Sequence, residues 1–204
     1  MVLTSKNTKK FGNQPKTTMD LSLIKHKLKN DFPLIREVTR AHPKRAAVMV
    51  MLYPKYNTTH VLMTRRATHL KYHAGEMSFP GGMFEEGQEN DLLATALRET
   101  QEELAIEIDQ GDVFGRLNIV YTRLGFEITP FVSVLHCAPE YEPDKNEVGE
   151  VLEIPFASLL STQQSAVRKN FSEEEEGIMY RFGHHEIWGA SAKILGQLTH
   201  LNTH

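Results

Sequence analysis

The sequence predicts an α/β fold, in which helices pack on a mixed β-sheet. An apolar, β-prone run at Ala46–Tyr53 is followed by a turn and then by His60–Arg65, and together they indicate a β-hairpin. The segment Asp91–Ile106 carries its apolar residues on one arc at about 100° per residue, which indicates an amphipathic helix. Because strands and helices mix without strict alternation, a mixed sheet covered by helices is the natural architecture.

Shorter periodic segments predict the remaining elements. Apolar residues at helical spacing indicate a short helix near residues 20–30. Further strands are expected at Val113–Tyr121, Phe126–Leu135 and Glu150–Ile154, and a terminal hairpin at Met179–Phe182 and His185–Trp188. A short helix is expected from Pro155 to Leu160 and a closing helix at Ala190–Leu201. The acidic tract Glu173–Glu176 is expected to be a solvated loop.

Length and composition indicate one globular domain. The chain has 204 residues, of which 40% are hydrophobic and 24% charged, which suits a single substantial core. Residues 1–18 contain Lys6, Lys9, Lys10 and Lys16, no acid and little apolar periodicity. We therefore expect a flexible tail at residues 1–18 and a single domain at residues 19–204.

Charge and cysteine content exclude several classes of partner. The formal net charge is −3, so no basic excess points to nucleic acid. No apolar stretch approaches the roughly 18 residues of a membrane span, and no signal peptide is recognisable. One cysteine, Cys137, excludes an intramolecular disulfide and predicts a reducing, cytoplasmic environment. We expect Cys137 to be a buried structural thiol. The sequence leaves open whether the protein forms a homodimer.

Residues 67–90 form a long irregular stretch before the predicted helix. It contains Gly75, Gly81, Gly82 and Gly87 among well-spaced apolar residues. Loops longer than about 12–15 residues are usually either functional or disordered. The apolar residues favour a functional loop.

The helix at 91–106 carries a cluster of carboxylates. Glu99, Glu102 and Glu103 project within an arc of about 100° beside the apolar face. Like charges three and four residues apart destabilise a helix by about 0.2–0.5 kcal/mol per pair. Such a cluster makes sense around a hard cation, because Mg²⁺ prefers oxygen ligands. The helix alone favours the alternative of an ordinary solvated Glu-rich face, and it is the Gly-Gly turn before the helix, where a backbone carbonyl can approach the same cation, that indicates a metal site.

The segment Gly82–Ile106 resembles the Nudix box. The matching residues are Arg98, Glu99, Glu102, Glu103 and Ile106, while Thr100 and Ala105 stand at positions that are usually apolar and glycine. The stretch from Gly82 to Arg98 is two residues longer than the general pattern, so the spaced glutamate of the box falls on Asn90, and Glu89 is its expected substitute. The resemblance implies an α/β/α sandwich around a mixed β-sheet and a hydrolase that uses Mg²⁺ or Mn²⁺ to cleave a diphosphate linkage.

The same resemblance implies roles for individual residues. Glu102 and Glu103 would be the main metal ligands, with a backbone carbonyl of Gly81 or Gly82. Glu99 would bind metal or orient water, and Arg98 would hold a neighbouring carboxylate in position. Glu147 is a candidate further ligand or general base, with an ordinary surface acid as the open alternative.

A second motif lies upstream. Leu62–Ala67, Lys71, Gly75 and Phe79–Gly82 resemble, with matching spacing, the signature of the coenzyme A pyrophosphatase branch of Nudix hydrolases. Segments 125–131, 147–151 and 187–192 also resemble that branch.

The branch resemblance implies hydrolysis of coenzyme A, a small-molecule diphosphate, to phosphopantetheine and adenosine 3′,5′-bisphosphate. Coenzyme A carries an additional ribose phosphate, so a basic cluster is needed. The candidate substrate-binding residues are Arg65, Arg66, Lys71 and Phe79. The alternatives are another nucleoside diphosphate derivative, such as ADP-ribose or a dinucleotide, and a non-catalytic binding module.

Overall fold

A computed structural model describes residues 20–35, 44–87, 89–170, 173–199 and 201. The tail predicted at residues 1–18 lies outside these described residues. Within them, no helix is long and apolar enough to cross a membrane.

The larger sheet is mixed and is built around the hairpin of β1 (Arg45–Lys55) and β2 (Thr58–Arg66). β1 runs parallel to β7 (Glu127–Val134), and β2 runs antiparallel to β8 (Val148–Pro155). Two short strands, β5 (Val113–Arg116) and β6 (Val120–Tyr121), pair with β7. The predicted hairpin and mixed sheet are confirmed, although the segment Val113–Tyr121 forms two strands separated by a break.

The long loop after β2 enters the sheet where β1 and β2 part. β1 pairs with β2 only through Leu52–Lys55, whereas Ala46–Val48 pair with β4 (Gly81–Met83). The loop also supplies β3 (Met77–Ser78), which pairs with β2. The stretch predicted to be irregular therefore contributes two strands, and these bring Gly81 and Gly82 against the middle of the sheet.

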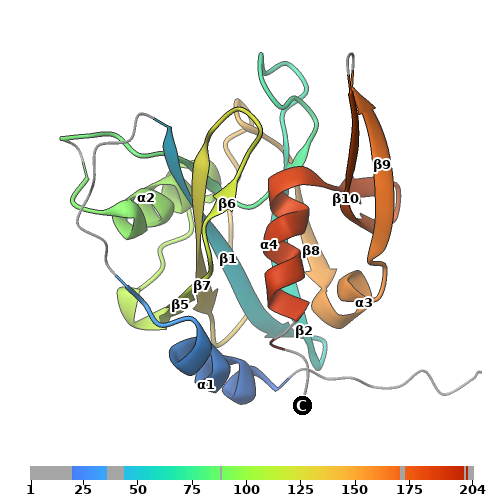
Figure 1. The fold of residues 1–204 in the computed structure, drawn as a ribbon. Helices are drawn as coiled ribbons and strands as arrows, with labels where there is room; N and C mark the ends of the chain where they lie inside the picture. The colour runs from blue at the N-terminus through green and yellow to red at the C-terminus, as the bar shows by residue number, and fades with distance from the viewer. Residues whose placement is uncertain (1–19, 36–43, 88, 171–172, 200, 202–204) are drawn as a thin grey trace, which may run out of the picture.

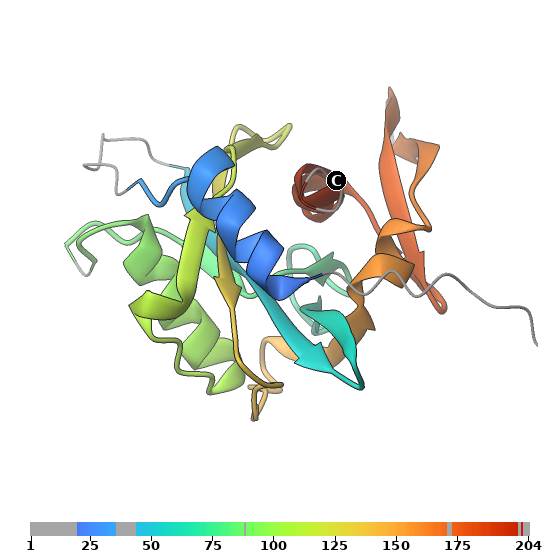
Figure 2. The same ribbon diagram turned by 90° about the horizontal axis from the view of Figure 1, so that it is seen from below.

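Helices cover both faces of this sheet, which confirms the α/β/α sandwich (Figures 1 and 2). α2 (Leu92–Leu104) covers one face, where it packs on Met49 and Met51 of β1. The other face is covered by α1 (Leu21–Asp31) and α4 (Gly189–Thr199), which pack on Val50 and Leu52. β1 is buried on both sides because successive side chains of a strand point to opposite faces.

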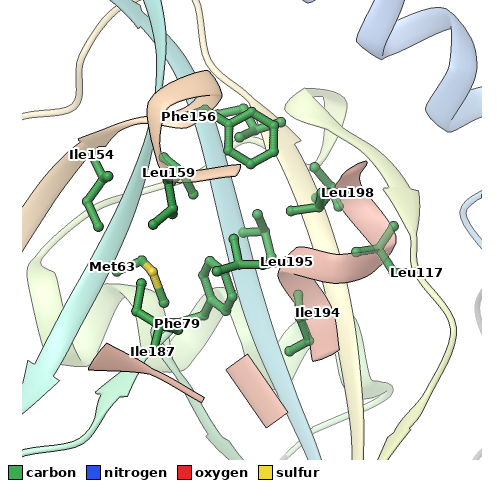
Figure 3. Packing of buried hydrophobic residues seen from close by; sticks show 14 of the residues in the cluster. Met63, Phe79, Leu117, Ile154, Phe156, Leu159, Ile187, Ile194, Leu195 and Leu198 are labelled. Carbon is green, nitrogen blue, oxygen red and sulfur yellow. The ribbon is translucent and has the colours of Figure 1, made fainter. Parts of the chain in front are cut away.

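The core on the α4 side gathers residues from distant segments (Figure 3). Phe79 of the long loop, Met63 of β2 and Ile187 near the C-terminus are 3%, 0% and 0% exposed and belong to one cluster. Leu195 of α4 and Phe156 of α3 (Phe156–Leu160) complete it. The long loop is thus anchored through its aromatic side chain.

A separate three-stranded sheet, seen beside α4 in Figure 1, precedes the last helix. It consists of β9 (Gln164–Asn170), β10 (Glu173–Phe182) and β11 (His185–Ile187), and β9 was not predicted. The predicted β10–β11 hairpin is confirmed. The loop predicted at Glu173–Glu176 is wrong, because these residues begin β10 and pair with β9. A run of acids lacks the apolar alternation of a strand, and pairing with β9 overrides that local signal.

The prediction of a buried Cys137 is also wrong. Its side chain is exposed, because β7 ends at Val134 and the chain has already left the sheet at Cys137. The prediction rested on the usual burial of free cysteines, which does not hold for a residue beyond the end of its strand.

The residue that ends α2 has a strained backbone conformation, which a single substitution can test. Ala105 caps the helix in the left-handed conformation, with φ 56°, which costs an L-residue roughly 1–2 kcal/mol. We predict that Ala105→Gly stabilises the fold by about 1 kcal/mol, since the relief of this strain exceeds the entropy that glycine adds to the unfolded chain. Urea unfolding measures the change.

Ala94→Gly is the matched control, because Ala94 lies in the first turn of the same helix and does not have the left-handed backbone of Ala105. The identical chemical change should there destabilise the fold by about 1 kcal/mol. Equal losses at both positions would contradict the assignment of strain to Ala105.

Candidate functional site

The helix α2 presents its carboxylates at three degrees of burial. Asp91 caps its first turn, where the carboxylate accepts a hydrogen bond from the Ala94 amide at 2.9 Å. Glu103 follows Thr100 by three residues and Ala96 by seven, so it lies on the buried face and is only 4% exposed. The side chain of Glu99 is 15% exposed and that of Glu102 is 56% exposed. The cluster therefore runs from the protein interior to solvent.

Glu103 has a buried carboxyl group with an unused oxygen. Its Oε2 atom is buried and has no hydrogen-bond partner among the described residues. Burial raises the pKa of Glu103 to about 8, and the negative charge of Glu99 adds to the rise. The guanidinium of Arg66 and a backbone hydrogen bond from Gly81 act in the opposite direction on this pKa. Such an oxygen is a suitable ligand for a cation, which would take the place of the proton.

Two glycines let the backbone of β4 approach these carboxylates. A Cβ atom on Gly82 would lie 2.1 Å from Oε1 of Glu99. A Cβ atom on Gly81 would lie 2.2 Å from the carbonyl oxygen of Ala47, and Gly81 has φ 154°. Glycine is required at Gly81, where an added Cβ would meet backbone, whereas at Gly82 it would displace the end of the Glu99 side chain. The glycine backbone and the carboxylate oxygens together match the all-oxygen ligand set of a magnesium or manganese ion.

Arg98 ties the acids of the site together. Its Nε donates to Oε1 of Glu89 at 2.6 Å, its Nη2 to Glu99 at 2.9 Å and its Nη1 to Glu102 at 2.6 Å. These bonds offset the like-charge repulsion expected along the helix. The same bonds occupy oxygens of Glu99 and Glu102, which are two candidate metal ligands. Accordingly, no three His, Cys, Asp or Glu side chains of the described residues are arranged as a metal-binding group.

Glu89, the expected substitute for the spaced glutamate of the box, was given no catalytic or metal-binding role from the sequence, and in the structure it is a positioning residue. Its side chain is 3% exposed and also accepts hydrogen bonds from Thr95 Oγ1 at 2.5 Å and from the Glu85 amide at 3.1 Å. Glu89 thus fixes Arg98 from the loop side. The sequence signal for this role is an acid shortly before a helix that contains an arginine, since the two can form an ion pair.

Glu147 lies at the same site although it is distant in sequence. Its negative charge raises the pKa of both Glu99 and Glu103, after the larger contribution of their burial. Its carbonyl oxygen accepts a hydrogen bond from the Ala67 amide at 2.8 Å, which joins the loop before β8 to the end of β2. The side chain is exposed, and a role as ligand or base stays a prediction.

The predicted basic cluster divides at the end of β2. Arg66 lies near Glu103, whose pKa it lowers, and the buried Nε of Arg66 has no hydrogen-bond partner among the described residues. Arg65 instead bonds to Oε2 of Glu150 through its Nε at 3.1 Å. Lys71 is exposed, with its Nζ 5.2 Å from the ring centroid of Tyr72.

The prediction that Phe79 contacts the substrate is corrected. Phe79 is 3% exposed and packs in the core on the α4 side, as Figure 3 shows. Because its ring is buried in the core, Phe79 cannot contact the substrate. It contributes to the site by anchoring the segment that continues into Gly81 and Gly82.

Comparison with known proteins agrees with this arrangement. The family model of the NUDIX domain matches residues 43–181. An uncharacterized Nudix hydrolase, NudL, of Pectobacterium atrosepticum is 30% identical over 168 residues, which cover 81% of this chain and 85% of that protein. The Yersinia pestis protein of the same description is 33% identical over 160 residues, covering 76% of this chain and 78% of that protein.

Solved structures agree on the fold. A MutT/nudix family protein from Enterococcus faecalis matches with a TM-score of 0.54 at 13% identity, covering 89% of this chain and 74% of that one. The family model covers the glutamate helix, the glycine pair and the basic end of β2 described above. The chain belongs to the Nudix family and is a hydrolase of diphosphate substrates.

Proposed function

We propose that this Nudix hydrolase cleaves coenzyme A or a close derivative to phosphopantetheine and adenosine 3′,5′-bisphosphate, with Mg²⁺ or Mn²⁺. The observation that carries the proposal is the position of Arg66, whose guanidinium lies beside the buried carboxylate Glu103. Arg66 belongs to the segment that resembles the coenzyme A branch, and Glu103 belongs to the metal-binding helix.

This position suits a diphosphate. A guanidinium with an unused buried Nε can donate to a phosphate oxygen, and the carboxylates beside it would hold a cation against the same phosphates. Arg65, the residue before Arg66, lies on the other side of the strand end, and its guanidinium can bind a further phosphate. Coenzyme A needs both, because it has a phosphate on the ribose in addition to its diphosphate.

The reaction is attack of water on one phosphorus of the diphosphate, with cleavage of the bond between that phosphorus and the bridging oxygen. Glu103, Glu102 and a carbonyl of Gly81 or Gly82 would hold the divalent cation, which neutralises the diphosphate and acidifies water. Glu99 orients the water or joins the ligands, and Arg98 keeps Glu99 in place. Glu147 is the candidate base, because its exposed carboxylate reaches the cluster from a separate loop.

A substrate screen tests the proposal directly. Wild-type protein is incubated with coenzyme A, ADP-ribose and a dinucleotide, with Mg²⁺ or Mn²⁺, and the products are identified by mass. We expect the highest kcat/KM for coenzyme A, the two products named above, and no turnover in excess chelator. A higher kcat/KM for another diphosphate would overturn coenzyme A as the substrate. If none of the compounds is turned over, the protein is a non-catalytic binding module.

Glu103→Gln tests the metal site. We expect turnover to fall by at least about 10²-fold, because a ligand charge is lost. In chelator the variant should melt at or above the wild-type temperature, since a neutral amide is buried without the proton uptake that the raised pKa of Glu103 imposes on folding. Added Mg²⁺ should raise the melting temperature of the wild type more than that of the variant.

The control is Glu107→Gln, which alters an exposed acid just beyond α2. It should leave turnover and both melts unchanged. If Glu103→Gln melts far below wild type in chelator and gains equally from Mg²⁺, the carboxylate is structural and does not bind metal.

Gly82→Ala tests the close contact between the glycine turn and Glu99. The added Cβ would meet the end of a flexible side chain, so the fold should survive while Glu99 is displaced. A displacement of about 1 Å can cost about 10²-fold in rate, and we expect a loss of that order in kcat. The melting temperature should stay close to that of wild type.

Gly177→Ala serves as the control, because an added Cβ there would meet no atom within 4 Å. It should preserve both kcat and stability. Normal kcat in Gly82→Ala would show that the position of Glu99 does not matter for the reaction.

A further inference from the structure

A groove of about 380 Å³ lies between the long loop and the β10–β11 hairpin. Its lining includes Arg65, Gly75, Met77, His184, His185 and Trp188. Ligand pockets in proteins usually measure about 300–1,000 Å³. The groove therefore has room for one part of a coenzyme-sized molecule and not for the whole.

The two walls of the groove are fixed to the same core. Met77 and Ile187 are 5% and 0% exposed, and both belong to the core cluster on the α4 side. Figure 3 shows Ile187 beside Met63 and Phe79. Ser191 Oγ of α4 donates to the carbonyl oxygen of Met77 at 3.0 Å. The groove is preformed, which reduces the entropy lost when a ligand binds.

The groove offers planar groups. The rings of His184 and His185 are 3.9 Å apart between centroids, and Trp188 lines the groove beside them. Aromatic rings and guanidinium groups stack on heteroaromatic bases. A flexible, unconjugated chain such as pantetheine has no ring with which to stack.

One carboxylate positions the cationic side of the groove. Glu150 accepts a hydrogen bond from Arg65 Nε at 3.1 Å, and its other oxygen is 3.7 Å from Nε2 of His185. His185 is 8% exposed, so this imidazole is held inside the wall. Arg65 remains one-third exposed and can contact a ligand.

The groove begins one residue from the carboxylate site. The register of β2 with β8 shifts between Arg65 and Arg66, because Arg65 is opposite Glu150 and Arg66 is opposite Val148, which leaves Gly149 of β8 as the extra residue. Val148 packs on the α2 side, so the two arginines face opposite sides of the strand end. A molecule that crosses this end can reach both.

We propose that the groove binds the heteroaromatic base of the nucleotide half of the substrate, by stacking on Trp188 and His184 beside Arg65. The inference rests on the proposed function, since it places one half of that substrate. The other half, phosphopantetheine, then lies outside the groove.

Trp188 supplies the measurement because it is the only tryptophan of the chain. Wild-type protein is titrated with adenosine 3′,5′-bisphosphate and, separately, with phosphopantetheine, and fluorescence is corrected for absorbance by the base. We expect a saturable change with the nucleotide and none with phosphopantetheine. No saturable change with millimolar nucleotide, or a saturable change with phosphopantetheine alone, would overturn the proposal.

His184→Ala tests the contact. His184 is exposed, so its removal should leave the fold intact, and the Kd for adenosine 3′,5′-bisphosphate should rise about tenfold, at the lower end of the value of a base stack. His136→Ala is the control, because the side chain of His136 is 81% exposed and is not part of the groove lining. Equal Kd values for wild type and His184→Ala would contradict stacking there.

The two proposals fail separately. If wild type does not hydrolyse coenzyme A but nucleotide binding still depends on His184, the substrate assignment falls and the groove assignment stands. If coenzyme A is hydrolysed with the same KM by wild type and His184→Ala, and nucleotide leaves the fluorescence unchanged, the groove assignment falls and the function stands.

Discussion

Glu103 places a carboxylate on the face of α2 that packs against the sheet, and the surrounding charges follow from this burial. Desolvation penalises the anion and raises its pKa. Arg66 and the backbone of Gly81 favour the charged form from the side of the sheet, while Arg98 holds Glu99 and Glu102 on the side of the solvent. The acids can lie close together because positive charge is present on both sides of them.

The topology of the sheet determines where that charge can be. β1 and β2 are paired near their turn and then part, and β3 and β4 pair with them beyond that point. This pairing sets Gly82 opposite Ala47, in the layer directly beneath α2. A strand with ordinary side chains could not lie there, because the carboxylate of Glu99 and the Ala47 carbonyl occupy the space of a Cβ atom.

The sequence allowed most of the fold and the members of the carboxylate cluster to be predicted. Strong periodicity located α2 and the β1–β2 hairpin, since apolar spacing reflects burial directly. The burial of Phe79 was missed because a loop aromatic gives no periodic signal. The exposure of Cys137 was missed because the general burial of free cysteines outweighed its place beyond β7, and the strand at Glu173 depends on a partner that local sequence does not reveal.

The division between Arg65 and Arg66 follows from the alternation of side chains along β2, but only the packing of the two faces shows that Arg66 lies on the α2 side. This division separates the carboxylate site under α2 from the proposed base-binding groove on the other face of the sheet. The two remain connected through one segment, since Met77 lines the groove and Gly81 and Gly82 lie only a few residues later. Phe79 anchors that segment in the core between them, so the groove and the glycines beside the carboxylates are held by the same short stretch of backbone.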